Sequence, residues 1–202
     1  MKIAMQLYGF PKGMLEVIIM QMVRLVKDGQ EFKMSKRSGQ SLTLNDLLIT
    51  IGKDAARWFL VSQPADSHLE IDVDKATKKD NNNALYYVQY AYARINQVLA
   101  KSKYEELKKY DNLTHPLERE LLIQLSVFPN TLAKIAESNS VNILTVYLVG
   151  LAKLFHSYYA QVKLIDPSAP SLTKTRMGLI KAIQQVIANG LVLMDIKPTE
   201  KM

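Results

Sequence analysis

A short basic segment, Lys33 to Gly39, carries the residue types that proteins use to handle phosphate groups. It places three cations, two serines and a glycine within seven residues, directly after an apolar stretch. Lys36 and Arg37 can neutralise phosphate oxygens, and Ser35 can add a hydroxyl hydrogen bond. The segment is therefore either a phosphate-handling loop or a solvated basic turn between two elements.

A second group of functional residue types lies between residues 86 and 98. At helical spacing, Tyr90 and Arg94, with Tyr86 or Tyr87 one turn earlier, form a stripe of aromatic and hydrogen-bonding groups. Such side chains can stack on unpaired bases and meet phosphates, as single-stranded RNA recognition requires. The alternative is that these tyrosines are half-buried core residues. A later segment, 154–159, has the same ambiguity, and the histidine within it is expected to pack or cap rather than bind a metal.

The overall composition is that of a globular protein with a basic surface. Of the 202 residues, 48% are hydrophobic and 22% charged, and the net charge of +7 favours a polyanionic partner such as nucleic acid. The chain has no cysteine, which fits a cytoplasmic protein. Charges interrupt the apolar runs before they reach the length of a membrane span, and no signal peptide is recognisable, so no membrane partner is expected.

The elements that would position the basic segment are short and mixed. Met1 to Tyr8 is interpreted as the last turns of a helix, so the beginning looks truncated. The apolar run 14–26 predicts a buried strand, followed by an Asp-Gly turn. Helices are predicted over 44–51, where Thr43 and Asp46 would form a capping box at the N-terminus, and from an Asp54 cap to about residue 62. Residues 64–74 predict a connector with an extended piece.

The remainder of the chain has the periodicity of helices. They are predicted at about 75–101, 115–127, 129–138, 141–164 and 172–194. We therefore expect two domains, residues 1–72 and residues 73–202, the second of which is a helix bundle.

Several separate segments together resemble arginyl-tRNA synthetase. They are Lys33 to Gly39, residues 54–57, residues 66–72, the run Tyr86 to Arg94 and the final Lys201-Met202, in the order and separation of that family. The resemblance implies a mainly α fold. It comprises the C-terminal remnant of a class I Rossmann-like α/β catalytic domain with its signature loop, followed by an all-helical anticodon-binding domain.

Three departures from the family pattern limit what the resemblance implies. Class I synthetases also use a His-x-Gly-His-type motif that binds ATP phosphates, and His68, His115 and His156 do not form one. Most of the catalytic domain is therefore expected to be missing, and the chain to be a C-terminal fragment. Arg37 stands where the general class I signature has serine, which leaves its individual role open. Tyr92 replaces a frequent histidine and is left out of the expected site.

The resemblance implies specific roles for the two groups of residues. In the intact enzyme, ATP with Mg²⁺ and arginine form arginyl-adenylate, and the arginyl group then passes to its tRNA. Lys33 and Lys36 would be catalytic, and both would bind ATP together with Met34, Ser35 and Arg37. No protein metal ligand is expected. The residues expected to bind the anticodon loop of an arginine-specific tRNA are Tyr87, Tyr90, Arg94, Tyr158 and Met202.

Two other functions remain open at this stage. The chain could be a free-standing helical RNA-binding or scaffold protein in which the basic segment is incidental. It could instead belong to another class I synthetase, such as the methionine or cysteine enzyme. The missing cysteine zinc sites argue against the second alternative, and the run Tyr86 to Arg94 argues against it more strongly.

Overall fold

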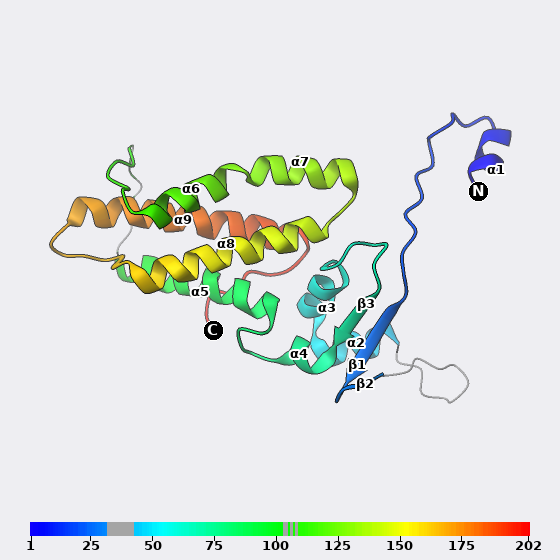
Figure 1. The fold of residues 1–202 in the computed structure, drawn as a ribbon, viewed down its shortest axis with the longest axis horizontal. Coiled ribbons are helices and arrows are strands. Elements are labelled where there is room, and N and C mark those ends of the chain that lie inside the picture. Colours follow the sequence, from blue (N-terminus) through cyan, green and yellow to red (C-terminus); the bar gives the residue numbers. More distant parts are fainter. Residues whose placement is uncertain (32–42, 103–104, 106, 108) are drawn as a thin grey trace.

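The computed structural model describes residues 1–31, 43–102, 105, 107 and 109–202. A small sheet with short helices forms the first part of the chain, and long helices form the second (Figure 1). The elements, in chain order, are α1 (Lys2–Leu7), β1 (Val23–Lys27), β2 (Gln30–Glu31), α2 (Leu44–Ile51), α3 (Lys53–Leu60), β3 (Leu69–Asp72), α4 (Val73–Thr77), α5 (Ala84–Ser102), α6 (Pro116–Ser126), α7 (Phe128–Ser138), α8 (Asn142–Gln161) and α9 (Pro170–Leu193).

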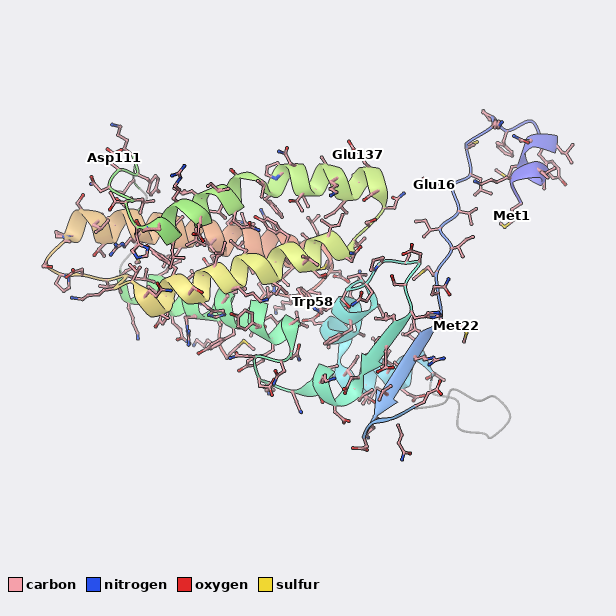
Figure 2. The ribbon with its side chains drawn as sticks, in the orientation of Figure 1. Met1, Glu16, Met22, Trp58, Asp111 and Glu137 are labelled. Carbon is pink, nitrogen blue, oxygen red and sulfur yellow. The ribbon has the colours of Figure 1, made fainter. Side chains whose placement is uncertain are left out.

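The sheet has the strand order β2-β1-β3 in the described part of the chain. Strand β1 pairs antiparallel with β2 across the predicted Asp-Gly turn and parallel with β3, where Leu25 lies opposite Ile71. The predicted strand 14–26 is wrong over most of its length, because only Val23 to Lys27 pairs. Residues 14–22 have no neighbouring strand among the described residues, and they lead away from the sheet to α1 (Figures 1 and 2).

Helix α3 packs against β3, and α2 packs against α3 and α4. The predicted capping box at the start of α2 is confirmed, because Asp46 N–H donates to the Thr43 hydroxyl and Thr43 N–H donates to Asp46. Gly52 ends α2 at a φ of +83°, which favours glycine. The prediction that Asp54 caps α3 is wrong: the helix already begins at Lys53, so Asp54 lies in its first turn. Trp58 on α3 is 1% exposed and anchors this part of the core (Figure 2).

The single helix predicted at 75–101 is in fact two helices, α4 and α5. The buried Asn83 separates them because its side chain satisfies the backbone at both ends. Its amide donates to the carbonyls of Ala76 and Lys78, and its oxygen accepts from the N–H groups of Leu85 and Tyr86. A polar residue that caps its neighbours in this way favours a break over a continuous helix.

Helices α5 to α9 form the predicted bundle, and α6 to α9 end within three residues of their predicted bounds. Helix α5 packs against α8 and α9 through an apolar face that includes Val88, Ala91 and Ile95, all 0% exposed. Helix α8, by length and composition alone, is apolar enough to cross a membrane, which the sequence reading did not predict. Its contacts with the surrounding helices make it the core helix of this bundle.

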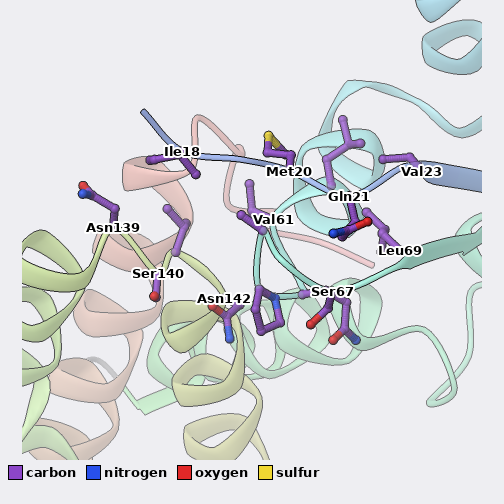
Figure 3. Close-up of a pocket in the computed structure, with 15 residues that line it drawn as sticks. Ile18, Met20, Gln21, Val23, Val61, Ser67, Leu69, Asn139, Ser140 and Asn142 are labelled. Carbon is purple, nitrogen blue, oxygen red and sulfur yellow. The ribbon is translucent and has the colours of Figure 1, made fainter. Parts of the chain in front are cut away.

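Helix α3, in the first part of the chain, contacts the residues that follow α9 in the bundle. Arg57 Nε donates to the carbonyl of Met194 at 2.6 Å, and Lys53 pairs with Asp195 at 2.8 Å. A hollow of about 180 Å³ lies between residues 18–23, residues 60–69 and the turn between α7 and α8 (Figure 3). Buried apolar residues form a continuous cluster across both parts. The domain boundary after residue 72 stays a prediction.

Candidate nucleic-acid interface

The tyrosine and arginine stripe lies on one face of α5. Tyr86, Tyr90 and Arg94 follow one another at intervals of four residues, so they lie on successive turns of the helix. The rings of Tyr86 and Tyr90 stack with their centroids 6.1 Å apart and their planes 14° apart. Arg94 follows, and its Cζ lies 4.3 Å from the centre of the Tyr90 ring. The helix alone thus accounts for an aromatic row that ends in a cation.

His156 on α8 packs behind this row. Its ring lies 4.5 Å from the ring of Tyr87 and 5.5 Å from that of Tyr90, and its Nε2 lies 3.3 Å from the Tyr87 carbonyl oxygen. Burial, together with the nearby Arg94 charge, lowers the pKa of His156 although the Tyr87 carbonyl favours the charged form. The predicted packing role of this histidine is confirmed. It fixes the position of two tyrosines without adding charge at neutral pH.

Arg94 lies between two aromatic rings from different helices. Its Cζ is 4.3 Å from the Tyr90 ring centre and 4.5 Å from that of Tyr159 on α8. One guanidinium nitrogen also donates to the Tyr90 hydroxyl. Among the described residues no carboxylate pairs with Arg94, so its charge is left uncompensated.

Beside this stripe is an open cavity of about 470 Å³. The residues around it are Lys79, Asp80, Asn81, Tyr86, Tyr87, Tyr90, Arg94 and His156. Partial burial raises the pKa of the Tyr87 phenol, so this group stays protonated and can donate a hydrogen bond. The cavity combines aromatic walls with the cations Lys79 and Arg94. This is the chemistry that binds an unstacked base together with its phosphate.

Tyr158, which was expected to contact RNA, lies inside the bundle. It is 0% exposed, and its hydroxyl donates to Glu118 at 2.8 Å. Burial and this bond to a carboxylate raise the pKa of its phenol. A fully buried ring cannot stack on a base, so Tyr158 has no part in the interface that the exposed tyrosines form. Its neighbour Tyr159, 38% exposed, is the residue that reaches the surface next to Arg94.

Glu118 is the centre of the buried cluster that holds Tyr158. Its carboxylate also accepts from Arg176 Nε at 2.8 Å and from the His115 N–H at 2.9 Å. Burial by itself would raise the pKa of Glu118. The hydrogen bonds from His115, Tyr158 and Arg176 outweigh that effect, and the pKa is lowered. Glu118 is therefore ionised and fully paired in the folded protein.

Met202 lies at the end of a tail that returns along α5. Gln89 and Asn96 donate from their side-chain amides to the carbonyls of Lys197 and Glu200, each at 3.3 Å. Met202 is 45% exposed and lines a second hollow that it shares with Tyr86. The last residue is thus next to the end of the aromatic row.

The expected phosphate-handling residues Lys33, Met34, Ser35, Lys36 and Arg37 lie outside the described residues. In the described part of the chain no group of three or more histidine, aspartate or glutamate side chains is placed to hold a metal ion.

Sequence reasoning missed two residues of this surface. Tyr159 was noted only as part of an ambiguous segment, and Lys79 was given no part in binding. Neither residue has a local sequence signal, because Tyr159 contacts Arg94 from another helix and Lys79 reaches the cavity from the loop between α4 and α5.

Comparison with known proteins now defines the class. Residues 88–202 match the DALR anticodon binding domain, and the chain belongs to this family of helical domains. Over its full length it is similar to arginine–tRNA ligases. It is 50% identical to that of Ureaplasma parvum serovar 3 and 38% identical to that of Bacillus subtilis, and it spans 37% of the length of each.

A solved structure supports the same assignment. The chain superposes over all of its length on 44% of a chain from Campylobacter jejuni described as an arginyl-tRNA synthetase, with a TM-score of 0.87 and 32% identity. The arginyl-tRNA synthetase of Thermus thermophilus shares the fold, with a TM-score of 0.71 at 22% identity. The resemblance to the C-terminal part of this family and the mainly α fold are confirmed.

Proposed function

We propose that the cavity beside α5 binds the anticodon loop of an arginine-specific tRNA, as part of an arginine–tRNA ligase. The observation that carries this proposal is the row Tyr86, Tyr90 and Arg94 along that cavity. It lies at the start of, and just before, the residues that match an anticodon-binding domain. Aromatic rings and an uncompensated cation suit unstacked bases and the phosphates between them.

Each group at the cavity has a distinct part in binding. The rings of Tyr86 and Tyr87 offer surfaces on which a base can stack, and the Tyr87 hydroxyl can donate to a base edge or a ribose. Arg94 and Lys79 supply positive charge for phosphate oxygens. Met202, at the other side of Tyr86, can cover a bound base with its apolar side chain. Binding at this surface therefore combines stacking with charge.

The activity of the whole enzyme extends this proposal beyond the described residues. In that reaction the arginine carboxylate attacks the α-phosphate of ATP, pyrophosphate leaves, and the arginyl group then passes to the tRNA. In that reaction Lys33 and Lys36 would stabilise the charge that develops on the phosphates. Mg²⁺ accompanies ATP, and the described residues supply no cluster that fits it. We place this activity in the cytoplasm, in keeping with a chain that lacks cysteine.

The 202-residue chain alone is expected to bind tRNA without activating arginine. None of its histidines lies in a His-x-Gly-His motif, so it lacks a phosphate-binding element that class I enzymes require. Arginine-dependent exchange of pyrophosphate into ATP by the purified chain, above a control carrying Lys36→Ala, would contradict this expectation.

Direct binding measurements test the proposed interface. The chain should bind the anticodon stem-loop of an arginine-specific tRNA more tightly than the same stem with a scrambled loop. Arg94→Ala should weaken that binding about tenfold, which is the loss of one good arginine contact. Arg119→Ala removes an exposed arginine on α6 and serves as the matched control, with little expected effect.

The alternative function is that of an RNA-binding protein without preference for an anticodon. The net charge of +7 favours it, because charge alone supports non-specific binding. Equal affinity for the two stem-loops would favour this function and contradict the anticodon proposal. Tighter binding to the anticodon stem-loop of a tRNA that another class I synthetase uses would indicate a different synthetase.

A further inference from the structure

The position of Arg94 depends on a residue that lies 65 positions away in the sequence. Tyr90 contacts it from the same helix, one turn earlier, and Tyr159 contacts it from α8. Both rings lie within 4.5 Å of the guanidinium carbon, so the cation is held between two helices. An arginine on a helix surface otherwise samples many rotamers, and two ring contacts reduce that freedom.

Tyr159 itself is held at the right place by the bundle. Its ring packs against that of Phe155, one turn earlier on α8, at 6.1 Å. The preceding residue, Tyr158, is 0% exposed, and the packing of α8 against α5, α6, α7 and α9 sets the rotation of α8 about its axis. The ring over Arg94 is thus a rigid feature of the fold, although it is 38% exposed.

Holding an arginine with rings differs from holding it with a carboxylate. Arg176 donates its Nε–H to Glu118 and an Nη1–H to the Lys163 carbonyl, and the ion pair with Glu118 neutralises its charge. No carboxylate among the described residues pairs with Arg94, so the rings restrict its motion and leave its charge available. One guanidinium N–H donates to the Tyr90 hydroxyl, and the remaining N–H groups at its edge can donate to an anion.

We infer that Tyr159 is a positioning residue for RNA binding. It holds Arg94 so that the guanidinium edge, rather than its face, meets a phosphate oxygen of the bound RNA. This inference rests on the proposed function, because it assigns a means of positioning to the same surface. Tyr159 acts through Arg94 and does not itself stack on a base.

A double-mutant cycle tests this inference with the same anticodon stem-loop as probe. Tyr159→Leu should weaken binding about threefold, the size of one exposed cation–π contact, and Tyr159→Phe should keep wild-type affinity because it retains the ring. In the Arg94→Ala background, Tyr159→Leu should have no further effect, because the group it positions is gone. Tyr8→Leu, at an exposed tyrosine near the N-terminus, is the matched control.

The salt dependence supplies a readout that a purely structural role would not change. Arg94→Ala should reduce the slope of log affinity against log salt by about 0.7, the loss of one phosphate contact on a single strand. Tyr159→Leu should reduce the slope in part, although it removes no charge. An unchanged slope would overturn the inference.

The remaining outcomes separate this inference from the proposed function. Equal losses from Tyr159→Leu with and without Arg94 would mean that Tyr159 contacts RNA directly, which overturns the positioning role alone. Wild-type affinity in Tyr159→Leu would also overturn it. If the wild-type chain does not prefer the anticodon loop, the proposed function fails, whereas coupling between Tyr159 and Arg94 in binding a phosphate would still be measurable with either stem-loop.

Discussion

Two adjacent tyrosines on α8 belong to two regions with opposite properties. Tyr158 points into the bundle, where it meets Glu118 and Arg176, and Tyr159 points to the surface, where it meets Arg94. Both regions combine tyrosine and arginine. In the buried region a carboxylate, Glu118, pairs with the arginine and accepts hydrogen bonds from Tyr158 and His115, whereas no ion pair holds Arg94 among the described residues.

The difference shows how the same residue types serve stability in one place and recognition in another. Glu118 is 0% exposed and accepts three hydrogen bonds, so these donor groups are already bonded within the protein and do not bind a ligand. Arg94 has aromatic neighbours in place of an acid, so its charge remains available to a phosphate. Stability and RNA binding should therefore respond to different substitutions.

The largest expected effect is on the buried region. Glu118→Ala should lower the free energy of unfolding by about 3–5 kcal/mol, because it leaves Arg176 and the Tyr158 hydroxyl without their partner. Urea denaturation measures this loss. Glu120→Ala, at an exposed position on the same helix, should change stability little. RNA affinity of the folded Glu118→Ala protein should stay near that of the wild type, and a specific loss of affinity would contradict the separation of the two regions.

The second-largest expected effect is a loss of RNA affinity in the exposed region. Tyr90→Ala should weaken binding to the anticodon stem-loop by about 1–3 kcal/mol, the range for one aromatic residue at a base-binding surface. Titration calorimetry or fluorescence anisotropy gives the affinity. Tyr90 is only partly buried, so its truncation should affect folding less than a core truncation does.

Val88→Ala is the matched control for Tyr90→Ala. Val88 lies on the same helix, half a turn away, and is 0% exposed. Its truncation should cost about 2 kcal/mol of stability and leave RNA affinity intact. If Tyr90→Ala instead lowers the melting temperature strongly and keeps affinity, Tyr90 belongs to the core and not to the interface.

A smaller effect should appear when acid protonates the buried region. The pKa of Glu118 in the folded protein is lowered from its ordinary value of 4.5, because the bonds from His115, Tyr158 and Arg176 outweigh the effect of burial. Its contribution to stability is therefore complete above about pH 4.5 and is lost as the pH falls through the lowered value. Between pH 6 and pH 3, the melting temperature of the wild type should fall more steeply than that of Glu118→Gln.

The smallest expected effect concerns His156 in the exposed region. Burial and the Arg94 charge lower its pKa below the ordinary value of 6.5, so the folded state favours the neutral ring. Stability from this group is present above about pH 6.5 and declines as the pH falls through the lowered pKa. The wild type should lose slightly more stability than His156→Gln between pH 7 and pH 5, and parallel curves would contradict this.

Local chemistry made much of the fold predictable. The capping box at Thr43, the turn after β1 and the α6 to α9 bounds all depend on neighbours in the sequence. The predictions failed where contacts between residues far apart in the sequence determine the secondary structure. Residues 14–22 have strand-like composition but no pairing partner among the described residues, and Asn83 breaks a helix because it bonds to both α4 and α5.

By itself the sequence determined the helical periodicity, the row Tyr86, Tyr90 and Arg94, and the family resemblance. These follow from spacing within one helix, where positions i and i+4 are neighbours whatever the surroundings. That Tyr158 is buried and Tyr159 is exposed follows from the packing of the helices, since adjacent residues differ by about 100° around a helix. The rotation of α8 against its neighbours places one ring on Glu118 and the other on Arg94, and that rotation is set by packing across the whole bundle.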